Sequence, residues 1–291
     1  MCKVEILVLA LAGLSGMVIG RATPFADQVV AYQPGTGYTK EYGTDLGYTN
    51  AAAALGQPSR QTVDPTPVFG GTFPVDPFSP PYLRDQLVSL GEGGSLTVQF
   101  NTPIYNDPIH PYGLDFIIFG SAGFLITNGD YTGGGVTDGS LLGNLNGASR
   151  VSVSEDNITY YSLNPAFAPA VDGNYPTDGN GDFTMPVNPA LGQSDFSGSN
   201  LAAIRALYAG SAGGAGYDLA WAQDAQGNSV DLSRIQYARV DVLTGHAEID
   251  GFAAVAAVPE PSVTLLGLVG TALFWPWLGL RSAARNKAVA H

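Results

Sequence analysis

The chain has 291 residues and a formal net charge of −13, with 12 Lys and Arg against 25 Asp and Glu. An acidic surface of this kind repels nucleic acid, which argues against nucleic-acid binding. The only cysteine is Cys2, which excludes disulfides and Cys metal sites from the rest of the chain, and 38 Gly with 20 Pro favour turns over long helices.

The first residues have the pattern of a secretory signal peptide. Lys3 precedes an apolar stretch from Ile6 to Ile19, and small residues surround Arg21 at its end. A basic start, a short apolar region and small residues at the exit are the three parts of such a signal. We expect residues 1–22 to be removed, by cleavage after Gly20 or Ala22, leaving a body over residues 23–257.

The body is expected to be mainly β-sheet with long loops. Apolar and polar residues alternate with a period of two in several segments, which places one face on a core and the other in solvent. The expected strands are Ser95–Phe100, a more buried run Leu114–Phe119, a hairpin of Arg150–Ser154 and Ile158–Tyr161 that turns at Glu155–Asn157, and a final pair Ile235–Leu243 and Ala247–Val255.

Two short helices are expected between the strands. Asn50 can cap a helix over Ala51–Leu55 that ends at Gly56, because an Asn side chain accepts hydrogen bonds from free N–H groups at a helix start. Asn200 can cap a second helix over Leu201–Tyr208, which ends near Gly210. Long loops rich in Gly, Pro, Asp and Asn separate these elements, at about residues 57–88, 101–112, 120–148 and 164–198.

Three short segments resemble the galactose-binding-like, or discoidin-type, jelly rolls. The hairpin from Val151 to Tyr161 is similar to their V-x-V-S-x-D strand, turn and aromatic strand, and Ala54–Pro58 resembles an A-L-G-x-P segment near their start. The segment Ala247–Phe252 is similar to their closing strand. The resemblance implies a jelly-roll-like β-sandwich, and it leaves the ligand open because fold and function separate easily.

Oxygen-bearing side chains in two segments could hold a structural Ca²⁺ ion, which takes six to eight oxygen ligands. The first is Asp178-Gly179-Asn180-Gly181-Asp182, with Asp172 and Asn174 upstream. The second combines Glu248 and Asp250 on one strand face with Asp241, and discoidin-like folds often hold Ca²⁺ with carboxylates near their first and last strands. The alternatives are an ordinary Gly-rich turn and solvent-facing polar alternation.

Catalytic motifs are absent from the sequence, so we expect a non-enzymatic protein. The patterns G-x-S-x-G, H-E-x-x-H and the P-loop do not occur, although carboxylates are frequent enough to leave a glycosidase pair open. Aromatic residues are common in the loops, and exposed rings can stack on the faces of sugars. Trp221 and Tyr112 are the candidate glycan contacts.

The last residues form a tripartite tail. Pro259-Glu260-Pro261 precedes an apolar run of 18 residues from Val263 to Leu280, and Arg281, Arg285 and Lys287 follow. As a helix the run would span roughly 27 Å, close to the thickness of a bilayer core, and the basic residues would mark its cytoplasmic side.

This tail, over residues 258–291, resembles the PEP-CTERM sorting signal of Gram-negative bacteria. The resemblance implies transient insertion in the inner membrane, processing near the Pro-Glu-Pro motif by an exosortase, and delivery to the cell surface or the extracellular matrix. A plain C-terminal membrane anchor is the alternative. Together these observations predict an exported glycan-binding or adhesive module whose partner is extracellular polysaccharide. The alternatives are a structural matrix protein without a specific ligand and an extracellular enzyme acting on polysaccharide.

Overall fold

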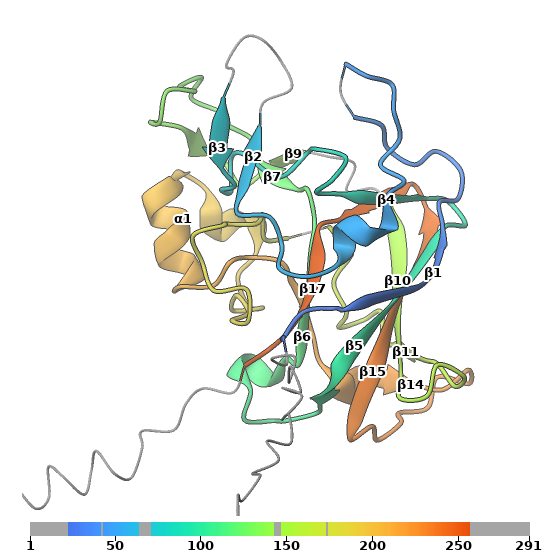
Figure 1. Cartoon of the computed structure of the whole chain (residues 1–291). Coiled ribbons are helices and arrows are strands. Elements are labelled where there is room, and N and C mark those ends of the chain that lie inside the picture. Colours follow the sequence, from blue (N-terminus) through green and yellow to red (C-terminus); the bar gives the residue numbers. More distant parts are fainter. Residues whose placement is uncertain (1–22, 42, 64–70, 143–146, 173, 257–291) are drawn as a thin grey trace, which may run out of the picture.

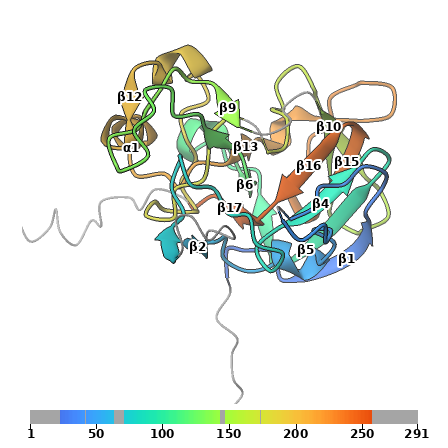
Figure 2. The same cartoon turned by 90° about the horizontal axis from the view of Figure 1, so that it is seen from above.

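The computed structural model describes residues 23–41, 43–63, 71–142, 147–172 and 174–256. The expected signal peptide and sorting tail lie outside these residues. The described part is mainly β, as the alternating segments predict, and its strands form two facing layers with a lobe of loops and one α-helix beside them (Figures 1 and 2). No helix in the described ranges is both long and apolar enough to cross a membrane.

The first layer is a six-stranded sheet in which every neighbouring pair is antiparallel. Its central strands carry the predicted alternation, and β15 lies between β5 and β10. In spatial order the strands are β1 (Gln28–Gln33), β5 (Ser95–Tyr105), β15 (Arg234–Thr244), β10 (Ala148–Ser154), β11 (Tyr161–Leu163) and β14 (Ala222–Gln223).

The second layer holds β6 (Phe116–Phe119), which pairs with β13 (Ala215–Tyr217) on one side and β17 (Gly251–Ala254) on the other. A separate pair, β4 (Val88–Gly91) and β16 (His246–Ile249), continues this layer. All four residues of β6 are buried, because Phe116 and Ile118 face the first sheet and Ile117 and Phe119 face the other way.

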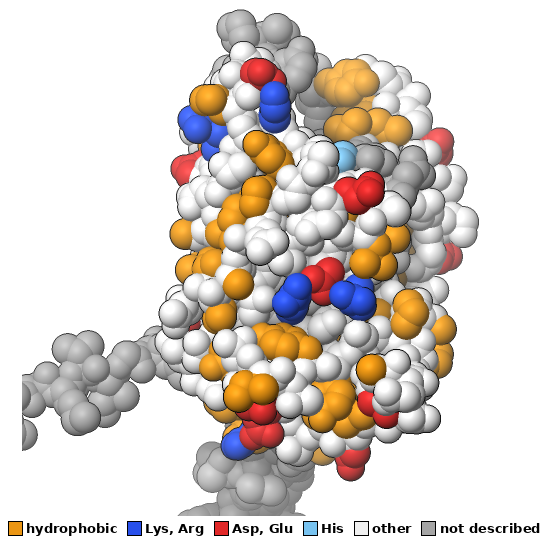
Figure 3. All heavy atoms as spheres, turned by 90° about the vertical axis from the view of Figure 1, so that its right-hand side faces the viewer, with side chains coloured by type: hydrophobic (Ala, Val, Ile, Leu, Met, Phe, Trp, Pro, Cys, Tyr) orange, Lys and Arg blue, Asp and Glu red, His pale blue; other side chains and the backbone are white. Residues whose placement is uncertain are grey.

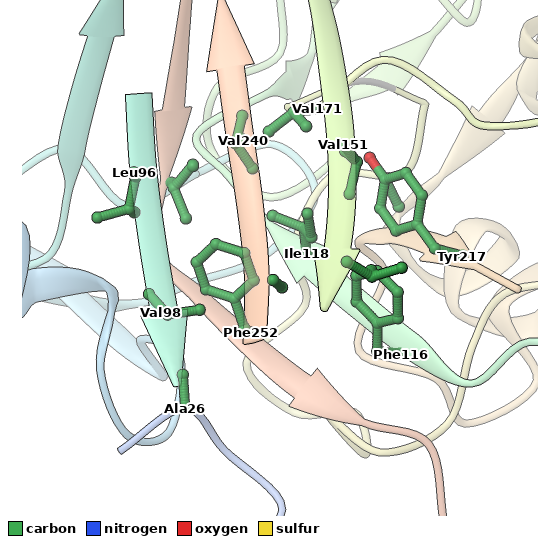
Figure 4. Packing of buried hydrophobic residues seen from close by; sticks show 14 of the residues in the cluster. Ala26, Leu96, Val98, Phe116, Ile118, Val151, Val171, Tyr217, Val240 and Phe252 are labelled. Carbon is green, nitrogen blue, oxygen red and sulfur yellow. The ribbon is translucent and has the colours of Figure 1, made fainter. Parts of the chain in front are cut away.

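The main core fills the space between the layers. Side chains from the sheet strands β5, β15 and β10 pack against those of β6 and β17 (Figure 4). The ring of Phe116 stacks on that of Tyr217, with their centroids 5.1 Å apart. Large apolar side chains buried in this way supply the main favourable term in folding, at roughly 1.5–3 kcal/mol for each one.

A smaller core holds the lobe that lies on the left of Figure 1. There α1 (Leu201–Tyr208) packs Ile204 and Tyr208 against Phe124, Tyr175 and Phe196. Short elements complete the lobe and the loops: β2 (Gln61–Val63), β3 (Thr72–Pro74), β7 (Gly123–Phe124), β8 (Val136–Thr137), β9 (Leu141–Leu142), β12 (Ser199–Asn200), and the 3-10 helices η1 (Ala51–Ala54), η2 (Pro111–Gly113), η3 (Gln193–Phe196) and η4 (Leu219–Trp221).

Both predicted helices occur at the expected places. The Asn200 side chain accepts the N–H of Ala203 at 3.0 Å and starts α1, and Asn50 accepts the N–H of Ala52 at 3.2 Å and starts η1. The first helix is a single 3-10 turn rather than an α-helix. Ala209, at φ 52°, ends α1 one residue before the expected Gly210.

The predicted hairpin of β10 and β11 is confirmed, with Ser152 opposite Ser162, although its return strand begins at Tyr161 rather than Ile158. The predicted final pair is wrong. Segment 235–243 lies in the first sheet as β15, whereas segment 247–255 breaks at Asp250 into β16 and β17, which pair with β4 and β6. Alternation shows that a segment is a strand, but it does not show which strand lies beside it.

Candidate functional site

The strands β5, β15 and β10 lie side by side in the six-stranded sheet, and the face that they turn away from the core is polar. Most of its polar side chains are uncharged, and a few charged ones lie near its middle. On β15, Ala238 and Val240 point into the core, so Tyr237, Arg239 and Asp241 point to the opposite face. Arg239 pairs with Thr97 of β5 and with Ser152 of β10 in the ladder. Figure 3 shows the side of the molecule on which β1, β5, β10 and β15 lie, with charges sparse among uncharged and apolar side chains.

Two arginines share one aspartate on this face. Asp241 Oδ1 accepts Arg239 Nε at 2.9 Å and Arg239 Nη2 at 2.7 Å, while Asp241 Oδ2 accepts Arg150 Nη2 at 3.2 Å. The carboxylate is 13% exposed and the two guanidinium side chains are 41% and 49% exposed. Asp241 is therefore less exposed than the two arginines and restrains both through its hydrogen bonds.

Two tyrosines adjoin this arginine pair. Tyr237 precedes Arg239 by two residues on the same face, and its ladder partner on β5 is Gln99. Tyr160 is half-buried, and this burial raises the pKa of its hydroxyl above the usual value. The nearby Tyr237 also raises that pKa, whereas the neighbouring Arg239 guanidinium lowers it. The hydroxyl donates to Asn157 Oδ1 at 2.6 Å. Two rings and two guanidinium groups therefore share one patch.

The hairpin turn fixes Tyr160 over the sheet. Asp156 accepts the N–H groups of Ile158 at 2.9 Å and Thr159 at 2.8 Å, and these bonds lower the pKa of its carboxyl. Asn157 takes the left-handed conformation at φ 61°, which Asn tolerates better than most residues. The segment Asp156–Asn157 thus closes the turn from its own side chains, and the return strand starts immediately after Tyr160.

A hollow of about 300 Å³ adjoins the arginine pair at the end of β10. Arg150 and Ser162 line it on the sheet side, and the loop that follows β11 lines the other, with Pro165, Ala168 and Pro169. A hollow of this size is at the lower end of small-ligand sites, and its walls are mostly apolar.

The residues of the first predicted Ca²⁺ site already have protein partners. Asp178 is buried and accepts Arg205 Nε at 2.6 Å and Arg205 Nη2 at 3.0 Å. Asp182 accepts the N–H and hydroxyl of Thr184, each at 2.8 Å, while Asn180 is exposed. The sequence reasoning missed Arg205 because it lies on α1, well separated from the Gly-rich loop in the chain.

The residues of the second predicted site have separate partners as well. Asp241 bonds the two arginines, Asp250 accepts the N–H and hydroxyl of Ser59 at 2.7 Å each, and Glu248 accepts the hydroxyl of Ser121. The described residues contain no group of three or more His, Cys, Asp and Glu placed to hold a metal ion. A bound Ca²⁺ ion stays a prediction.

The structure brings together two carboxylates that the sequence analysis assigned to different sites. Ser121 Oγ lies 3.4 Å from Asp172 Oδ2 and also bonds Glu248. Burial, and then the nearby Glu248, raise the pKa of Asp172 well above its usual range. Asp172 also accepts the N–H of Ala122 at 2.7 Å, which ties the loop after β6 to this pair.

The two predicted glycan contacts lie away from the arginine pair. Trp221 is half-buried in η4 and packs against the core, with its ring centroid 6.2 Å from that of Phe167. Tyr112 is 54% exposed in η2, at φ 60°. The sorting-motif residues Pro259, Glu260, Pro261, Arg281, Arg285 and Lys287 lie outside the described residues.

The comparisons with known proteins leave the family open. No family model matches the chain, and no curated protein matches it. Among solved structures, a pectin-binding carbohydrate-binding module covers 60% of this chain and 75% of its own, with 8% identity and a TM-score of 0.23. A glycoside hydrolase covers 66% of this chain with 11% identity and a TM-score of 0.21, and the chain spans 27% of its length. Both TM-scores are below 0.5, so neither likeness indicates a function for this chain.

Proposed function

We propose that this protein is an exported, non-enzymatic glycan-binding module, and that the glycan lies on the solvent face of the six-stranded sheet. One observation carries the proposal: Tyr237 and Tyr160 lie near the ion-paired Arg239, Asp241 and Arg150, and the ladder partners of Arg239 and Tyr237 on the neighbouring strands are Ser, Thr and Gln. Rings supply flat apolar contact to a sugar, and ordered polar groups fix its hydroxyls.

The preordered state of this face supports binding over a purely structural role. Asp241 restrains both guanidinium groups before any ligand arrives, and Asn157 accepts the hydroxyl of Tyr160, so less side-chain entropy is lost on binding.

Export to the cell surface or matrix rests on the two sequence signals, residues 1–22 and 258–291, and we retain it as part of the proposal together with exosortase processing. The test is the intact mass of the protein recovered from the host surface. A mass that excludes everything after about Pro261 supports sorting, and a mass that includes Val263 to His291 contradicts it.

Glycan binding is tested by affinity electrophoresis of the purified protein in gels that contain acidic or neutral polysaccharides. We expect Tyr237→Ala to weaken binding about tenfold, since one stacking ring is removed. Tyr131→Ala is the matched control, because Tyr131 is 67% exposed on a loop that contributes no strand to the six-stranded sheet. Unretarded migration of the wild type in every gel would refute the proposal, and equal loss in both variants would place the site elsewhere.

A further inference from the structure

We infer that the glycan bound at this face is acidic, with its carboxylates held by Arg239 and Arg150. The inference rests on the proposed function and narrows it to polyuronate-like chains. It comes from the local balance of charge: two guanidinium groups share the single carboxylate of Asp241, which leaves one positive charge in excess at the centre of the face.

The other ion-paired cations of the described residues have a carboxylate each. Lys40 pairs with Asp45, Arg84 with Glu41, Arg205 with Asp178 and Arg234 with Glu155. Arg60, which has no carboxylate partner in these ranges, lies over the ring of Phe183 and donates to the carbonyl of Gly179. Arg60 and this arginine pair are therefore the described cations without a carboxylate each, in a chain with a net charge of −13. An anionic ligand would complete the neutralisation of the pair.

The geometry leaves donors for such a ligand. A guanidinium has five N–H groups, and Asp241 takes two from Arg239 and one from Arg150. Both arginines are more exposed than the aspartate between them, so a carboxylate approaching from solvent meets the arginines first. Arginine binds carboxylates through charge-assisted and often bidentate hydrogen bonds, which are roughly twice as strong as neutral ones.

Two acidic residues lie at the hairpin that carries Tyr160. Glu155 is neutralised by Arg234, with Arg234 Nε 2.7 Å from Glu155 Oε1. Asp156, the next residue, stays ionised, and its oxygens accept backbone N–H groups of its own turn. Tyr237 lies two residues before Arg239, and Tyr160 lies two residues before Ser162, whose ladder partner Ser152 also pairs with Arg239. Both rings can therefore contact the sugar ring whose carboxylate Arg239 binds.

The test compares three probes: polygalacturonate, its fully methyl-esterified form and polyglutamate. The ester keeps the sugar chain and removes the charge, whereas polyglutamate keeps the charge and removes the sugar. We expect the wild type to bind polygalacturonate at least about tenfold more tightly than either of the others, and the affinity to fall as salt rises. Arg239→Met should lose at least about tenfold on polygalacturonate and change little on the ester.

Arg84→Met is the matched control, because it removes the same charge from a residue outside the strands of the six-stranded sheet, where Arg84 pairs with Glu41. It should leave polygalacturonate binding within about twofold of the wild type. Equal affinity for polygalacturonate and its ester overturns this inference and leaves the proposed function standing. Equal affinity for polygalacturonate and polyglutamate also overturns the inference, because the arginines would then bind any polymeric carboxylate. Failure to bind any polysaccharide overturns the proposed function itself.

Discussion

The ion pair of Arg205 and Asp178 joins α1 to the Gly-rich loop of the lobe. Asp178 is 2% exposed, and both of its oxygens accept hydrogen bonds from Arg205. Asp178 Oδ1 also accepts the N–H of Asn180, so the carboxylate anchors the Gly-rich loop to α1. Arg205→Met keeps most of the apolar stem and leaves the buried carboxylate without its cation.

Removing one partner of a buried ion pair costs about 3–5 kcal/mol, because an uncompensated charge remains in the interior. Arg205 is 36% exposed on its side chain, so water reaches the site and the expected loss is smaller, about 2–3 kcal/mol in the free energy of unfolding. Urea unfolding followed by tryptophan fluorescence measures this loss, from the shift of the midpoint at constant slope.

The double variant that combines Arg205→Met with Asp178→Asn is compared with the single variant Arg205→Met. Removing the charge together with its partner should recover at least about 1 kcal/mol of the loss, since the interior no longer holds an unpaired carboxylate. Arg84→Met, which breaks the more exposed pair with Glu41, should cost about 0–1 kcal/mol. A loss below about 0.5 kcal/mol in Arg205→Met would show that the ion pair does not hold the lobe, and would refute the reasoning.

Two further predictions concern pH and Ca²⁺. Burial raises the pKa of Asp250 to about 7, above its usual value, so the folded state binds this proton more tightly than the unfolded state, and the stability present at pH 4 is lost as pH rises through 7. The free energy of unfolding of the wild type, relative to Asp250→Asn, should therefore fall between pH 5 and pH 8 by up to about 3 kcal/mol, and a constant difference would contradict the raised pKa. For the cation, Ca²⁺ at the 178–182 loop must compete with Arg205 for Asp178, so Ca²⁺ should raise the thermal midpoint of Arg205→Met more than that of the wild type. Identical midpoints of that variant in Ca²⁺ and in chelator would argue against a calcium site on this loop.

Local patterns predicted the central strands and both helices, because these depend on local chemistry, but they did not predict β1, β4 and β13 or the short strands within the expected loops. The Asn200 cap, the alternation in Ser95–Phe100 and the fully apolar run ending at Phe119 each act within a few residues. Sheet order depends on contacts far apart in the chain, such as β15 between β5 and β10, and alternation does not carry that information. The break at Asp250 was missed for the same reason, because its partner Ser59 is 191 residues away in the chain.

The sequence predicts some of the contacts in the candidate site, and the others depend on how neighbouring strands pair. The sequence places Asp241 among possible metal ligands with Glu248 and Asp250, whereas in the structure its partners are arginines. The same period of two that identified β15 also places Tyr237 and Arg239 on the face of Asp241, so the nearest partner of that carboxylate was readable from the strand itself. Arg150 was not readable in this way, because its place opposite Asp241 depends on the register of β10 against β15. A site built across neighbouring strands therefore needs the register, and one ladder pairing here turns an isolated aspartate into a shared anchor for two arginines.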